Sequence, residues 1–134
     1  GVWKEEGKFR FEIDRITGQA SLVWTNGNKN SFEAYCKPIT QIMSENGHLS
    51  IDVLKMDIEG AGIEVLNQVL DAGVFPTQIV VEFERPRYST KGTYHFFEQV
   101  EHLALRMRDA GYHVARLPRS RASYFSVELL FSRI

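Results

Sequence analysis

The sequence predicts an α/β protein, because short apolar runs alternate with segments that have helical spacing. Two runs, at residues 51–60 and 78–83, are too short for helices and are bounded by glycine or proline. Each is predicted to be a buried strand, and the first is expected to be buried on both faces. Strands that alternate with helices are typical of a sheet covered by helices.

The first third of the chain is predicted to be mainly β-structure. Phe9, Phe11 and Ile13 alternate with charged residues, which indicates a half-buried strand. Thr17-Gly18 offers a turn after it, and Pro38 suits the first turn of a short helix. We expect strands over residues 9–13, 20–24 and 32–36, a turn at 26–28, and a short helix that stops at Gly47.

A helix is predicted after each of the two apolar runs. The first is expected to end at Gly73, and the second, over residues 94–110, at Gly111. Their inner faces should hold Ile63, Leu66, Val69 and Leu70 in the first helix and Phe97, Val100, Leu103, Ala104 and Met107 in the second. Residues 112–117 and 123–131 supply two last strands, which are expected to be antiparallel because the loop between them is short.

The composition restricts the class of protein. The 134 residues are 43% hydrophobic and 25% charged, as expected for one soluble globular domain with a core. A formal net charge of −1 gives no overall attraction to nucleic acid or anionic membranes, and no apolar run is long enough to span a bilayer. With Cys36 alone and no Cys/His cluster, no metal site is expected. A cytoplasmic location is favoured, but a leader upstream stays open.

Two carboxylates lie where the first apolar run changes into a helix. Asp57 and Glu59 end the strand, and open α/β sheets bind ligands at the carboxyl ends of strands, close to helix N-termini. The spacing leaves two interpretations open: the acids cap the helix and favour its dipole, or they take part in chemistry. Glu82 lies inside the second run, where a buried carboxylate needs a partner such as Arg85 or takes a raised pKa.

These residues also carry a resemblance to a known family. The string DVLKMDIEGA at residues 52–61, with EVL at 64–66 and IVVEF at 79–83, resembles the C-terminal half of FkbM-type S-adenosylmethionine-dependent methyltransferases. That family carries a D-x-L-K-x-D-x-E-G-A-E-x-x-V-L signature on the fourth strand and following helix of a Rossmann-like sheet. Gly62 departs from it, because the family usually has a second Glu there. The resemblance implies the C-terminal part of such a sheet, with an antiparallel final strand pair.

The resemblance further implies that residues 1–134 form a single partial domain. The glycine-rich cofactor half would lie upstream, and no G-x-G-x-x-G or P-loop pattern occurs in the sequence. The family's strand order, 3-2-1-4-5-7-6, then leaves the strand at residues 51–60 with a bare apolar edge. We expect this edge to be covered by the hairpin at residues 9–24, by self-association, or by another part of the protein.

The function implied by the resemblance is methyl transfer from S-adenosylmethionine, bound in the intact parent, to an oxygen or nitrogen of a small molecule or sugar. Asp57 would lie beside the methionine end of the cofactor and the nucleophile, where it orients an amine or accepts a proton. Glu59 and Glu82 are the other candidate catalytic residues, and Trp3 would lie near the adenine. A non-catalytic interaction module that uses the free sheet edge is the competing class. A nucleotide-binding oxidoreductase half shares the sheet but does not explain the signature.

Overall fold

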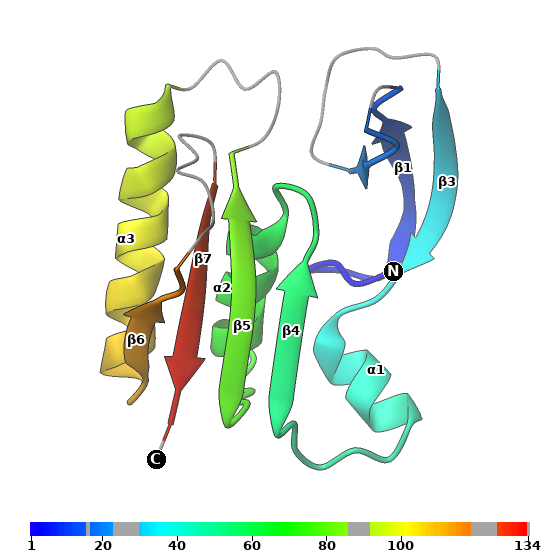
Figure 1. Cartoon of the computed structure of the whole chain (residues 1–134). Helices are drawn as coiled ribbons and strands as arrows, with labels where there is room; N and C mark the ends of the chain where they lie inside the picture. Colours follow the sequence, from blue (N-terminus) through cyan, green and yellow to red (C-terminus); the bar gives the residue numbers. More distant parts are fainter. Residues whose placement is uncertain (16, 23–29, 86–91, 119–125, 134) are drawn as a thin grey trace.

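The computed structural model describes residues 1–15, 17–22, 30–85, 92–118 and 126–133, and these form two sheets and three helices (Figure 1). The first sheet has the order β2-β1-β3, with β1 at Gly7–Ile13, β2 at Ala20–Ser21 and β3 at Ser31–Cys36. The second has the order β4-β5-β7-β6, with β4 at Val53–Asp57, β5 at Gln78–Glu84, β6 at His113–Arg116 and β7 at Ser126–Ser132.

The second sheet is mixed, and its final strand pair is antiparallel as predicted. Strands β4 and β5 are parallel, while β7 runs antiparallel to both of its neighbours, β5 and β6. A parallel pair needs a crossover, which helix α2 (Gly62–Asp71) provides between β4 and β5. The order of these four strands is the one that the resemblance implies for the last four strands of the sheet.

The core lies between the second sheet and its two crossover helices. In Figure 1, α2 lies behind the sheet, and α3 (Thr93–Asp109) lies beside β6. Most of the fully buried side chains come from both helices and from β5 and β7: Val65, Leu66, Val69, Ile79, Val81, Phe83, Leu103, Met107 and Phe131. Within the part of the chain that the structure describes, no helix is long and apolar enough to cross a membrane.

The prediction that the first apolar run is buried on both faces is wrong. Strand β4 lies at the edge of its sheet, and the Val53 side chain is 59% exposed. Lys55 is also exposed, and of the five β4 residues Met56 alone is buried. Since α2 covers one face, side chains that alternate along the strand divide between core and surface. Burial on two faces depends on neighbouring segments, which an apolar run cannot reveal.

The second apolar run shows the same alternation. Along β5, Ile79, Val81 and Phe83 are buried against the helices, whereas Glu82 on the opposite face is half-buried. The expectation of a fully buried Glu82 carboxylate is therefore corrected. The period of two in burial reflects a sheet with helices on one face within the described residues.

At the start of α3, the buried face is shifted by one residue from the predicted one. Phe96 is 3% exposed and belongs to the core, while Phe97, which the spacing placed inside, is 38% exposed. Residues 96, 100, 103 and 107 form the buried stripe. Both phenylalanines fit a period of 3.6 residues, so the pattern alone could not choose between them.

The other elements lie close to their predicted places. Helix α1 is Ile39–Glu45, and Gly47 follows it with a φ of +67°, a left-handed conformation suited to a helix stop. The predicted return strand is shorter, since β2 includes only Ala20 and Ser21 of the described residues. The predicted turn at 26–28 and the start of the last predicted strand lie outside the described residues.

The N-terminal segment is fastened between β3 and α1. The Lys37 N–H donates to the carbonyl oxygen of Gly1 at 3.0 Å, and the Trp3 N–H donates to that of Lys37 at 3.1 Å. Hydrogen bonds from Gln41 and Tyr35, each 2.9 Å, hold the pKa of the Glu6 carboxyl below its ordinary value. The backbone hydrogen bonds with Lys37 fix the position of Gly1 and Val2, which form part of the candidate site.

Candidate functional site

The chain makes a sharp turn between β4 and α2. Asp57 is the last residue of the strand, and Glu59 and Gly60 follow with φ angles of +38° and +86°. Glycine adopts this left-handed region readily, but a glutamate there costs about 1–3 kcal/mol. Such strain persists only where the surroundings hold it, and it concentrates at functional sites.

The N-cap residue of α2 is Ala61, and its side chain makes no capping hydrogen bond. The acidic residue in the first turn of α2 is Glu64. These observations do not decide between the two interpretations of Asp57 and Glu59, so capping and chemistry both stay predictions.

Two side chains from the first sheet reach the turn. The Ser21 hydroxyl donates to the carbonyl oxygen of Glu59 at 2.5 Å, and Gln19 Nε2 donates to Glu59 Oε1 at 2.7 Å. These partners precede Glu59 by 38 and 40 residues. Sequence reasoning missed both, since no local pattern links residues so far apart.

A cavity of about 210 Å³ lies between the turn and the first sheet. Asp57 and Glu59 line it from the turn, together with Ile58 and Ala61. The opposite lining comes from the first sheet and the N-terminal segment: Gly1, Val2, Phe11, Ala20, Ser21 and Leu22. The cavity thus combines two carboxylates with a largely apolar wall, and it lies at the carboxyl end of β4, as the sequence predicts for a ligand site.

Glu82 lies beside Asp57 in the sheet. The two residues are register partners on β4 and β5, and Glu82 is in turn the partner of Glu128 on β7. A row of carboxylates therefore crosses three strands on the face opposite the helices. Glu82 is not among the described residues that line the 210 Å³ cavity, so its role at the acceptor side stays a prediction.

Trp3 lies in the core. Its side chain is 6% exposed and packs edge-on against Phe9, with ring centroids 6.3 Å apart. The Lys4 ammonium lies 5.5 Å from the centre of the Trp3 ring. Trp3 is not among the described residues that line the cavity, and its assignment to the adenine stays a prediction.

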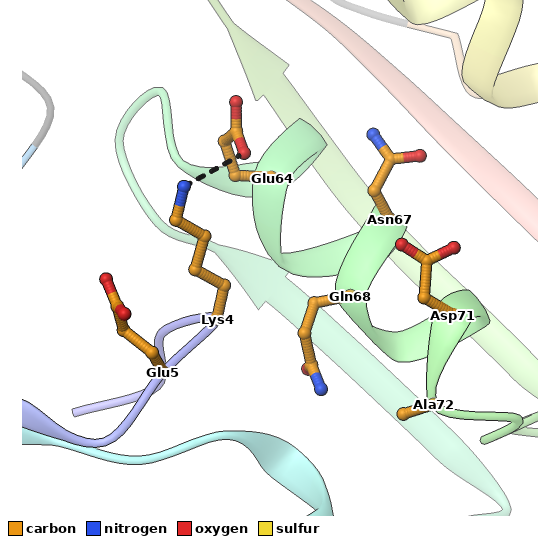
Figure 2. A pocket seen from close by; sticks show the side chains of 7 residues that line it. All are labelled: Lys4, Glu5, Glu64, Asn67, Gln68, Asp71 and Ala72. Atoms are coloured by element: carbon orange, nitrogen blue, oxygen red, sulfur yellow. Dashed lines mark ion pairs between the residues drawn. The ribbon is translucent and has the colours of Figure 1, made fainter.

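A second, wider pocket lies on the outer side of α2 (Figure 2). It has a volume of about 510 Å³ and is lined by Lys4, Glu5, Glu64, Asn67, Gln68, Asp71 and Ala72. Its lysine and Glu64 are 3.7 Å apart, and both side chains are about half exposed. An exposed ion pair of this kind adds little stability. The residues that line this pocket include none of the predicted site residues.

The departure at Gly62 leaves the cavity unchanged. Gly62 is the first residue of α2, and a Cβ there would lie 3.4 Å from side-chain atoms of both Val81 and Phe83. A side chain at this position would therefore start toward β5. The absent family acid is not one that the described cavity lining would have received from this position.

The two glycines of the turn should respond to alanine in opposite directions. Gly62→Ala is expected to stabilise the fold by about 0.5 kcal/mol, because its φ is not positive and the added methyl makes ordinary contacts. Gly60→Ala should destabilise it by about 1 kcal/mol or more, because its φ is +86°. Urea denaturation at pH 7 measures both. If Gly62→Ala were less stable than wild type, that result would contradict the packing described around Gly62.

Comparison with known proteins agrees with this geometry. The family model for the methyltransferase FkbM domain matches residues 3–114, which include the signature, the turn and the cavity-lining acids. No curated protein and no solved structure matches the chain. Because the match spans most of the sequence, the chain belongs to the FkbM methyltransferase domain family.

Proposed function

We propose that this protein transfers a methyl group from S-adenosylmethionine to an oxygen or nitrogen of a small molecule or sugar. The observation that carries the proposal is the cavity at the carboxyl end of β4, where Asp57 and Glu59 face an apolar wall. The family match and the strand order β4-β5-β7-β6 support a Rossmann-like methyltransferase sheet. Ligands of such sheets bind outside the carboxyl ends of the strands.

The lining of the cavity fits the chemical character of this cofactor. S-adenosylmethionine supplies an activated methyl group on a positively charged sulfur. Two carboxylates favour a cation, and the apolar side chains of Val2, Phe11 and Leu22 suit a weakly polar body. Pockets for ligands of this size usually enclose about 300–1,000 Å³, so the described cavity accommodates only part of the cofactor. We propose that further residues of the complete protein hold the remainder.

The chain's own residues supply positioning and a proton acceptor. Asp57 receives the proton that the acceptor hydroxyl or amine must lose, or orients that group in line with the methyl. Glu59 contributes negative charge beside the cationic centre. Glu82, which is the register partner of Asp57 on the neighbouring strand, orients the acceptor.

Calorimetric titration tests the proposal. S-adenosylmethionine is titrated into this chain and into the longest natural form of the protein, with adenosine as the control ligand. We expect measurable binding by the natural form and weaker binding by residues 1–134. Absence of binding by both proteins would remove the enzyme hypothesis.

An interaction module is the second candidate, and the exposed edge of β4 favours it. In the described residues β4 pairs only with β5, and Val53 on this strand is largely exposed. The first sheet contacts the turn after β4 without adding a strand to it. Light scattering on the chain separates the candidates: self-association that Val53→Lys abolishes supports the module, and a monomer without cofactor binding contradicts both.

A further inference from the structure

We infer that Gln19 and Ser21 are positioning residues for the cofactor side of the proposed methyltransferase site. The inference rests on the proposed function and adds to it a role for the first sheet. The Ser21 hydroxyl donates to the backbone carbonyl oxygen of Glu59, and the Gln19 amide donates to the Glu59 carboxylate. Together they hold the strained turn in the conformation that directs the Glu59 carboxylate.

The short segment that presents them is itself closed by hydrogen bonds. The Asp14 carboxylate accepts the Thr17 N–H at 3.0 Å, and the Asp14 carbonyl oxygen accepts the Gly18 N–H at 2.9 Å. The Asp14 N–H donates to the carbonyl oxygen of Gln19 at 2.8 Å. Asp14 is buried, whereas Thr17 and Gly18 are exposed. The backbone at Gln19 is therefore fixed by its bond to Asp14 before any ligand binds.

Ser21 is fixed even more firmly. It is 2% exposed, and β2 pairs it with Glu12 of β1. Its hydroxyl donates to the carbonyl group that follows the strained φ of Glu59. A left-handed glutamate is maintained only when its surroundings determine it, and this bond supplies a backbone restraint. The hydrogen bond from Gln19 then selects the direction of the side chain.

The chemistry of the Gln19 contact gives a sharp test. The amide nitrogen of Gln19 donates to a carboxylate oxygen of Glu59. Gln19→Leu removes this donor, keeps a similar size and adds no charge to the cavity. The defect of this variant therefore reports the loss of the hydrogen bond.

The experiment compares three variants of the complete natural protein. Gln19→Leu should weaken S-adenosylmethionine binding about tenfold or more, as expected for the loss of a charged hydrogen bond. Ser21→Ala should also weaken binding, and Ser21→Thr, which keeps a hydroxyl, should restore it. Equal affinity of wild type and Gln19→Leu would overturn the inference.

Gln41→Leu is the matched control. Gln41 also donates to carboxylates, at 2.9 Å to Glu6 and 3.0 Å to Glu45, but it lies outside the cavity lining. This variant should leave cofactor affinity unchanged. A loss equal to that of Gln19→Leu would mean that the substitution acts through general stability, and would also overturn the inference.

Hydrogen exchange separates this inference from the proposed function. The Ala61 N–H bonds to the carbonyl oxygen of Ile58 at 2.9 Å, across the strained turn. Its exchange without ligand should accelerate at least tenfold in Ser21→Ala and Gln19→Leu but not in Gln41→Leu. Unchanged exchange in both variants contradicts the positioning role. If wild type binds no cofactor, the proposed function fails. Faster exchange in the two variants would still support the inference that Gln19 and Ser21 fix the conformation of Glu59.

Discussion

Replacement of Asp57 by asparagine is expected to lower methyl-transfer turnover by about 100-fold or more. Asp57 ends β4 and lines the cavity, and its side chain is on the exposed face of the strand. Asparagine keeps the size of the side chain but neither accepts a proton nor carries a charge. Loss of a positioned general base usually costs 10²–10⁴ in rate, about 3–5 kcal/mol at the transition state.

The measurement is the rate of demethylated cofactor formation with an accepted substrate, beside an unfolding curve for each variant. Asp52→Asn is the matched control, since Asp52 is exposed just before the same strand and its carbonyl oxygen accepts the Gln78 N–H. The control should keep its activity, and both variants should unfold at the wild-type urea concentration. Full activity of Asp57→Asn, with its fold intact, would contradict both a proton-accepting and an electrostatic role for this carboxylate.

The position of the candidate site could be predicted from the sequence because it depends on a local change of pattern. Asp57 and Glu59 follow an apolar run and precede a helical spacing, and the carboxyl end of a strand is where such sheets bind ligands. The choice between capping and chemistry could not be made at that level, since it depends on the partners that the two carboxylates meet in the folded chain.

The conformation of Glu59 was beyond the reach of local patterns. A left-handed φ is expected at glycine, and Gly60 satisfies that expectation, but the preceding glutamate shares it. Two of its contacts come from Gln19 and Ser21, at the start of β2 in the other sheet. Contacts between residues 38 and 40 positions apart follow from tertiary packing, which neither propensity nor periodicity encodes.

Burial was predicted well for helices and poorly for strands. The period of 3.6 residues identified Leu66 and Val69 in α2 and Leu103 and Met107 in α3, all of them buried. The apolar content of residues 51–60 suggested burial on both sides, yet Val53 is largely exposed. An apolar residue on a strand is buried only if another segment covers its face. The strand is present as predicted, but the sequence does not show which segments cover it.

Phe131→Ala is expected to cost about 3–5 kcal/mol of unfolding free energy, the largest stability effect among the substitutions considered. Phe131 is fully buried on β7 and is the register partner of Ile79 on β5 and Val114 on β6. Its ring meets those of Phe83 and Tyr112 edge-on, each at 6.5 Å between centroids. Truncation removes buried apolar surface and leaves a cavity between the central strands and the helices.

Urea denaturation of Phe131→Ala and wild type measures this cost, with Phe32→Ala as the control. Phe32 stacks on Phe11 at 5.2 Å between centroids but is 44% exposed, so its loss should cost about 1 kcal/mol. A domain of this size is stable by about 5–15 kcal/mol, and Phe131→Ala therefore removes a large share. A difference below 1 kcal/mol between the two variants, at unchanged m-values, would contradict a core centred on β5 and β7. Because β5 also holds β4 in register, that core supports the strand that ends at Asp57.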